Sequence, residues 1–161
     1  MPSDHDNEGR HPALRQRSAT VLEEARLWAA TEYGYNSRRV RATTNENLKT
    51  RTNYDAHPWQ QDVAEALLLR IDCLVIAGTG SGKTTPFLLP LLLPENKGKF
   101  ALIVSPLLSL QAKQAGKFNH VHVLSVAVNN ETMGKEMLQR LRTASPDAAL
   151  QAIFAGPELA R

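Results

Sequence analysis

The sequence predicts an α/β fold in which helices flank a mostly parallel β-sheet. Two observations carry this prediction. Apolar runs typical of buried strands alternate with segments of helical periodicity through residues 53–161. One strand-to-helix connection is the glycine-rich stretch Ala77–Thr84, AGTGSGKT, which has the pattern of a P-loop. Strands that alternate with helices form βαβ units, and such units build parallel sheets.

The domain boundaries follow from where these periodic patterns begin. Residues 1–19 mix charged residues, Pro, His and Gly without periodicity, so we expect them to form a disordered tail. Residues 20–52 are expected to form an N-terminal helical extension. Residues 53–161 carry the alternation of strands and helices and form the main domain, which is large enough for one hydrophobic core.

The extension begins with an amphipathic helix. Thr20 and Glu23 fit a capping box, apolar residues then recur at helical spacing, and Gly34 ends the pattern. Trp28 lies on the apolar side, where we expect it to pack on the main domain. The basic cluster that follows, residues 36–41, is expected to be a solvated surface.

The first elements of the main domain surround the P-loop. Pro58 suits the first position of a helix that runs to about Leu69. The apolar run Leu74–Ile76 is expected to be a strand buried on both faces, with Cys73 as a small buried neighbour. A helix is expected over residues 83–93, and Pro90 should kink or end it.

Further strands and helices alternate after this helix. The spacing predicts strands at Phe100–Val104, Val121–Val128 and Ala148–Phe154, and helices at Pro106–Phe118 and Thr132–Arg142.

Composition excludes several classes of protein. The single cysteine permits neither an intramolecular disulfide nor a cysteine-based zinc site. We expect no membrane span, because the longest apolar run is short and contains Pro90. The N-terminus lacks a signal-peptide core, so we expect a soluble intracellular protein, nuclear or cytoplasmic. The net charge of +3 and pI of about 9.2 permit a polyanionic partner without arguing for one.

The residue types of the P-loop suit a bound triphosphate. Backbone N–H groups bind the phosphates, and glycines remove side-chain bulk and allow positive φ. Lys83 is expected to place its charge between the β- and γ-phosphates, and it is the one catalytic residue that we expect. The hydroxyl of Thr84 is expected to bind Mg²⁺. The expected contacts to ATP in this loop are Gly78, Thr79, Gly80, Ser81, Gly82, Lys83 and Thr84.

Four segments, in this order, resemble motifs of the first RecA-like domain of superfamily 2 DEAD/DEAH-box helicases, and most closely those of the RecQ type. They are His57–Gln60, Ala77–Thr84, Ile103–Leu110 and Ala155–Leu159. The resemblance covers about two thirds of the chain. It implies a RecA-like domain that uses ATP and Mg²⁺ to act on nucleic acid.

The resemblance also implies roles for individual residues. Gln60 matches the glutamine that reads adenine, since its amide is both donor and acceptor. Ser105, Ser109 and Pro157 match positions that lie along the phosphates of a single strand. Tyr54 is the aromatic residue nearest to the position that stacks on the base. Similarity to RecQ favours DNA as the strand and movement from 3′ to 5′.

Two parts of such helicases are not found in this sequence: the strand that ends in Asp-Glu-x-His/Asp, and the second RecA-like domain. We therefore expect a domain truncated before that motif, the ATP-binding part of a helicase that does not unwind by itself. One alternative is a non-enzymatic remnant that binds nucleotide or nucleic acid. A weaker alternative is an unrelated P-loop phosphotransferase, such as a small-molecule kinase.

Overall fold

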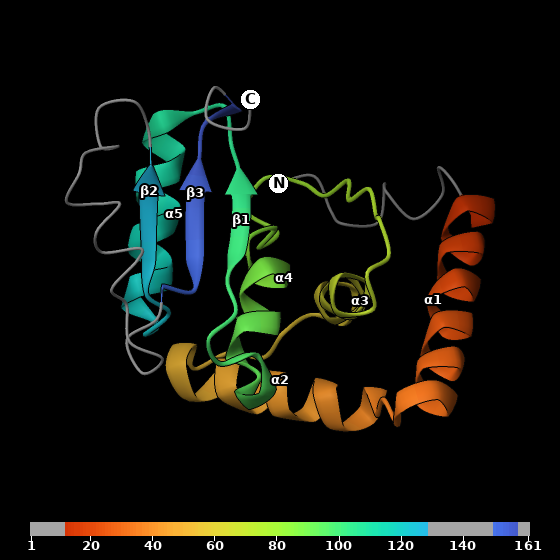
Figure 1. Ribbon diagram of the computed structural model, residues 1–161. Coiled ribbons are helices and arrows are strands. Elements are labelled where there is room, and N and C mark those ends of the chain that lie inside the picture. The colour runs from red at the N-terminus through yellow and green to blue at the C-terminus, as the bar shows by residue number, and fades with distance from the viewer. Residues whose placement is uncertain (1–11, 129–149, 158–161) are drawn as a thin grey trace.

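The computed structural model describes residues 12–128 and 150–157. The whole of the expected helix Thr132–Arg142, and residues Glu158 and Leu159, lie outside these ranges. Figure 1 shows the described elements, which in chain order are α1 (Pro12–Tyr33), α2 (Ser37–Thr52), α3 (Pro58–Leu68), α4 (Thr85–Leu88), the 3₁₀ helices η2 (Leu89–Leu92) and η3 (Pro94–Asn96), β1 (Ala101–Val104), α5 (Leu108–His120), β2 (Ser125–Val128) and β3 (Ala152–Ala155).

The sheet is parallel, as the sequence predicts. Its strand order is β1-β3-β2, and both pairings are parallel. Val104 of β1 and Val128 of β2 both lie opposite Ala155 of β3, so the carboxyl ends of all three strands share one edge. In Figure 1, α5 connects β1 to β2 and covers one face of the sheet. The fold is therefore α/β with flanking helices, which confirms the predicted class.

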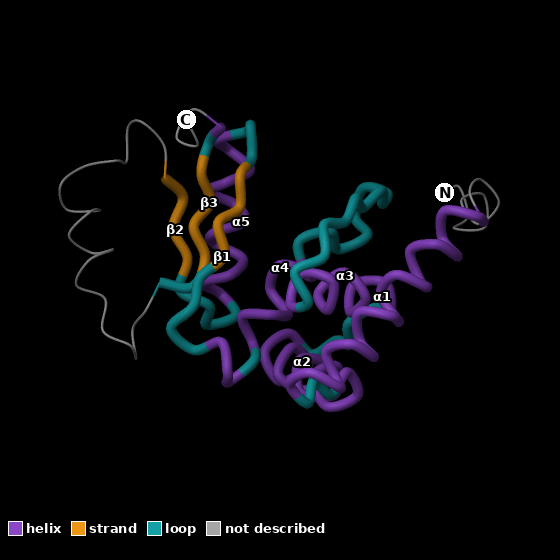
Figure 2. The backbone as a smooth tube through the Cα atoms, turned by 45° about the vertical axis from the view of Figure 1, so that its right-hand side comes forward, coloured by secondary structure: helices purple, strands orange, loops and turns teal. Residues whose placement is uncertain are grey.

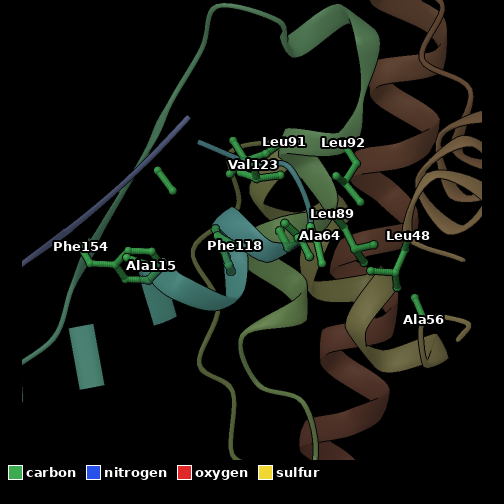
Figure 3. Close-up of a cluster of buried hydrophobic side chains, with 13 residues drawn as sticks. Leu48, Ala56, Ala64, Leu89, Leu91, Leu92, Ala115, Phe118, Val123 and Phe154 are labelled. Atoms are coloured by element: carbon green, nitrogen blue, oxygen red, sulfur yellow. The ribbon is translucent and has the colours of Figure 1, made fainter. Parts of the chain in front are cut away.

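One hydrophobic core joins the helices to the sheet. Phe118 of α5 and Phe154 of β3 meet edge to face, with ring centroids 5.2 Å apart. Leu89 of η2 and Leu48 of α2 continue the same cluster away from the sheet (Figure 3). Burial of these apolar side chains, which supplies the main driving force for folding, thus fixes α2, η2, α5 and β3 against one another.

The strand expected before the P-loop is absent. Residues 71–78 have no regular secondary structure, and the side chains of Leu74 and Ile76 are 88% and 83% exposed. Cys73, expected to be buried, is exposed as well. No described strand pairs with this segment. An apolar run becomes a strand only when a neighbour supplies hydrogen bonds and covers its side chains, and the sequence pattern does not reveal that neighbour.

The N-terminal helices also differ from expectation. Helix α1 begins at Pro12, so residues 12–19, which we expected in the tail, include its first two turns. Pro suits a first helical position, and the Ala, Leu, Arg and Gln residues that follow favour helix. Thr20 bonds back to the Gln16 carbonyl instead of capping a helix. Trp28 is exposed, and its ring contacts that of Tyr33.

The basic cluster begins a second helix that sequence periodicity does not reveal. Asn36 caps α2, since its side chain accepts a hydrogen bond of 2.9 Å from the N–H of Arg39. Gly34, at φ 70°, ends α1 as expected, and α2 begins three residues later. None of the described helices combines the length and the apolar character that a membrane span requires.

Proline and burial explain the details of two helical segments in the main domain. The helix after the P-loop changes at Leu89 from α-helix to the 3₁₀ helix η2, as expected of a segment that contains Pro90. At the start of α5, Leu107, which precedes the helix, and Leu110 are both exposed. The buried face instead carries Gln111, Ala115 and Phe118, which are spaced four and three residues apart.

A buried carboxylate joins α1 and α2 to α3. The Glu65 side chain of α3 is 1% exposed, and its Oε2 atom accepts hydrogen bonds from Arg26 Nη2 at 2.5 Å and from Arg41 Nε at 2.6 Å. The Tyr35 hydroxyl donates to Oε1 at 3.1 Å. Asp62, one turn earlier on α3, bonds to the same two arginines. These contacts hold three helices at one point.

The charged partners decide the protonation of Glu65. Burial alone raises the pKa of its carboxyl, but hydrogen bonds from Ser37 and Arg26 and the charge of Arg41 outweigh burial, so the pKa lies below its usual range. Burial also raises the pKa of the Tyr35 phenol, and the negative charge of Glu65 raises it further. Glu65 is therefore ionised and Tyr35 neutral near neutral pH.

We expect Leu89→Ala to lower the free energy of unfolding by about 2–5 kcal/mol, because it empties a fully buried position of the core. Leu74→Ala, the matched control, should change it by less than about 0.5 kcal/mol, since Leu74 is almost fully exposed. Urea unfolding of both variants measures the difference. A loss in Leu74→Ala as large as that in Leu89→Ala would show that Leu74 is buried.

We also expect Glu65 to contribute to acid sensitivity. Its folded pKa is lower than the unfolded value of about 4.5, so its stabilising contribution is complete above the unfolded pKa and is lost as pH falls through the folded pKa. Glu65→Gln should cost about 3–5 kcal/mol near neutral pH, and its stability should fall less than that of the wild type between about pH 6 and pH 3. Urea unfolding across that range measures the stability of both proteins at each pH. Identical pH dependence in the wild type and Glu65→Gln would contradict the lowered pKa of Glu65.

Candidate nucleotide-binding site

The P-loop connects α3 to α4 and projects from the helices (Figure 2). Two glycines adopt left-handed conformations, with φ 84° at Gly80 and φ 77° at Gly82. The N–H and the hydroxyl of Ser81 both bond to the Gly78 carbonyl, at 3.4 and 2.8 Å, and Thr85 N–H bonds to the Gly82 carbonyl at 3.0 Å. The loop is thus a chain of tight turns, which requires glycine where φ is positive.

Lys83 points back across the loop. Its Nζ atom donates to the carbonyl oxygens of Ala77 at 2.9 Å and of Gly78 at 2.6 Å. The side chain is exposed, and no ion pair ties it to a carboxylate in the described part of the chain. An ammonium group in this position is free to exchange neutral carbonyl acceptors for the charged oxygens of a phosphate.

Thr84 precedes the first turn of α4, and its side chain makes no capping hydrogen bond. Its hydroxyl is therefore available as an oxygen ligand, the type that Mg²⁺ prefers. Within residues 12–128 and 150–157, no three His, Cys, Asp or Glu side chains come together as a metal site.

Gln60 contacts the P-loop directly, although the two are about twenty residues apart in sequence. Its Nε2 atom donates to the carbonyls of Ser81 and Gly82, each at 3.2 Å. Its Oε1 atom accepts the His57 N–H at 2.8 Å, which completes a capping box at the start of α3. A Cβ atom on Gly82 would lie 2.6 Å from Nε2, so this approach also requires glycine. Gln60 therefore links α3 to the loop by hydrogen bonds.

A cavity of about 750 Å³ opens beside the loop. Gly82, Thr84 and Thr85 line one side of it, and Tyr54, the expected stacking residue, lines it as well. The charged or titratable residues of its other walls are Arg51, Lys113, Lys117 and His120. Among the described residues, no acidic side chain lines the cavity, so its electrostatic character favours an anionic ligand.

The residues expected to meet a nucleic-acid strand gather at the carboxyl edge of the sheet. Ser105 follows β1, and its N–H bonds to the Ala155 carbonyl of β3 at 2.9 Å, which brings it close to Pro157. Ser109 lies in the first turn of α5 and is exposed, as is Pro157. Ser105 differs, because it is only 6% exposed and its carbonyl accepts a bond from Gln111.

Sequence reasoning missed the residues that hold these elements in place. Gln111 is fully buried and bonds to the Ser105 carbonyl at 2.7 Å. Glu65 anchors the helix that carries Gln60. The spacing of Gln111, four residues before Ala115, was the available signal for its burial, whereas Glu65 lies away from the apolar stripe of its helix and carried none.

The comparisons with known proteins agree with this geometry. A family model described as DEAD/DEAH box helicase matches residues 57–160. The chain is 31% identical over 119 residues to an ATP-dependent DNA helicase RecQ of Synechocystis sp., which covers 73% of this chain and 24% of the relative. It is 42% identical over 81 residues to "Probable ATP-dependent RNA helicase DDX59" of Rattus norvegicus, covering 47% and 14%. With ATP-dependent DNA helicase Q-like SIM of Arabidopsis thaliana it shares 39% identity over 61 residues, covering 38% and 7%.

The chain thus spans about a quarter or less of the length of these curated relatives. The matched region contains the P-loop, Gln60, the parallel strands and the residues at the carboxyl edge of the sheet. On this evidence the chain belongs to the DEAD/DEAH box helicase family, with relatives of the RecQ type.

Proposed function

We propose that this chain binds Mg·ATP at the P-loop and is the ATP-binding part of an ATP-dependent helicase that acts on single-stranded DNA. The conformation of the P-loop is the observation that carries the proposal. Two glycines at positive φ shape a loop free of side-chain bulk, and Lys83 lies across it within hydrogen-bond distance of the carbonyls at its start.

The residues present fit a Mg²⁺-bound triphosphate. Backbone N–H groups of Gly80, Ser81 and Gly82 would bind the phosphates, Lys83 would pair with the β- and γ-phosphates, and the Thr84 hydroxyl would hold the metal ion. Mg²⁺, when bound, would neutralise charge on the phosphate oxygens. The cavity beside the loop supports this assignment, because the charged side chains of the described residues that line it are basic.

Gln60 and Tyr54 are proposed to bind the base. Tyr54 lines the cavity and presents an exposed ring on which adenine could stack. Gln60 lies against Gly82, and both N–H groups of its amide already donate to loop carbonyls. Reading adenine would therefore require the amide to exchange one of these bonds for a bond to the base.

We place the nucleic-acid strand at the carboxyl edge of the sheet. Ser109 and Pro157 are exposed there, and Ser109 lies in the first turn of α5, where backbone N–H groups favour phosphate. The printed names of the relatives include both DNA and RNA helicases. RecQ resemblance favours DNA and movement from 3′ to 5′. We expect the 161-residue polypeptide to bind without unwinding a duplex, because the Asp-Glu-x-His/Asp motif of such helicases is not found among these residues.

We expect Lys83→Ala to weaken Mg·ATP binding about 10- to 100-fold, because it removes charge-assisted hydrogen bonds to the phosphates. Lys49→Ala is the matched control: Lys49 forms an exposed ion pair with Asp55 and should leave the affinity unchanged. Isothermal titration calorimetry with and without Mg²⁺ measures both. Equal ATP affinity in the wild type and Lys83→Ala would overturn the assignment of the loop.

For the strand, we expect fluorescence anisotropy to show tighter binding of single-stranded DNA than of RNA of the same sequence. Ser109→Ala should weaken DNA binding about 2- to 10-fold, through loss of one hydroxyl bond to a phosphate. Thr31→Ala removes an exposed hydroxyl from α1 and serves as the control. Tighter binding of RNA would reject DNA as the strand, and an unchanged affinity in Ser109→Ala would place the strand elsewhere.

A further inference from the structure

Two sets of polar contacts, joined by helix α3, link the N-terminal helices to the P-loop. This series begins at Arg26 of α1 and Arg41 of α2, passes through Glu65 and Gln60 of α3, and ends at the carbonyl of Gly82. Helices α1 and α2 precede residues 57–160, the region that the family model matches. The extension thus reaches the P-loop through α3 in this series, while Arg51 at the end of α2 lines the cavity beside the loop.

The first step of the series is the buried ion cluster. The Glu65 carboxylate is 1% exposed, so it depends on the guanidinium groups at 2.5 and 2.6 Å and on the Tyr35 hydroxyl for the hydrogen bonds that water would otherwise supply. Arg41 spans Glu65 and Asp62 through Nε and Nη2, which fixes the orientation of α3 as well as its distance. A shift of α3 would break several of these bonds together.

The second step runs along α3 to the loop. Gln60 and Glu65 lie on the same helix of 11 residues, which moves as a rigid element. At Gln60 the amide bonds to two consecutive loop carbonyls, and Gly82 leaves no room between its backbone and Nε2 for even a Cβ atom. A displacement of α3 therefore changes the conformation of the loop at Ser81 and Gly82.

We propose that Arg26 and Arg41 are positioning residues for nucleotide binding: they hold α3 so that Gln60 keeps the P-loop in the shape that receives phosphate. This inference rests on the proposed function of the loop. It gives the N-terminal extension a role in nucleotide affinity that neither its sequence nor the family match assigns. Its specific consequence is that the arginines act only through Gln60.

A double-mutant cycle tests this consequence. The dissociation constant of a fluorescent ATP analogue with Mg²⁺ is measured for the wild type, Arg41→Ala, Gln60→Ala and the double variant. We expect each single change to raise the dissociation constant about 10-fold, and the double variant to match Gln60→Ala alone. If Arg41 had a merely structural role, Arg41→Ala would weaken binding of the analogue whether or not Gln60 is present.

Arg39→Ala is the matched control. Arg39 lies on the same helix two residues earlier, and its Nη2 atom pairs with Glu95 Oε1 at 2.5 Å on the surface. Its loss should leave the dissociation constant unchanged. If Arg41→Ala does not fold by circular dichroism, Arg41→Lys replaces it in the cycle, since lysine keeps the charge beside Glu65 but loses the two-point contact.

The outcomes separate this inference from the proposed function. If the wild type binds the analogue and Arg41→Ala or Arg41→Lys binds equally well, the positioning role is wrong while the P-loop assignment stands. If the effects of Arg41 and Gln60 multiply in the double variant, the arginine does not act through Gln60 and the inference is overturned. If the folded wild type does not bind the analogue, the proposed function fails and the inference fails with it.

Discussion

The carboxylate of Glu65 is the interaction on which the arrangement of the helices depends. An ionised group shielded from water is stable only where other groups replace its hydration, and here two guanidinium groups and a phenol do so. Each comes from a separate segment of the N-terminal half, so these segments must converge on α3. Apolar burial alone would allow α3 several orientations, since hydrophobic contacts are not directional. The ion cluster selects one of them.

The sequence predicted where individual strands and helices lie along the chain better than it predicted which elements pair or pack with one another. The strand Phe100–Val104 and the helix from Pro58 follow from local periodicity, and the structure contains both with ends within two residues. The run Leu74–Ile76 has the same apolar character but no strand, because strand formation depends on hydrogen bonds to a partner distant in sequence. Helix α2 was not identified as a separate element of the expected helical extension, because its surface is largely polar and few of its positions are buried, namely Val40, Thr44 and Leu48.

In the candidate site, too, features encoded by adjacent residues could be predicted, and contacts between distant elements could not. The glycines and Lys83 could be identified from sequence, because a phosphate-binding loop is encoded by adjacent residues. The contact of Gln60 with Gly82 could not, since it joins residues on two elements whose separation is set by tertiary packing. Gln111 and Glu65 were missed because a buried polar side chain looks like a surface residue until its partners are known.

The position of β1 at the side of the described sheet has a consequence for the protein in solution. Leu102 and Val104 of this strand are exposed, and β1 pairs with β3 on one side only. Such an edge presents backbone donors and acceptors in a row beside apolar side chains, which is the template for intermolecular strand addition. At high protein concentration, self-association should therefore begin at β1 and show an increase in β-structure, while the helical end of the molecule keeps its native contacts.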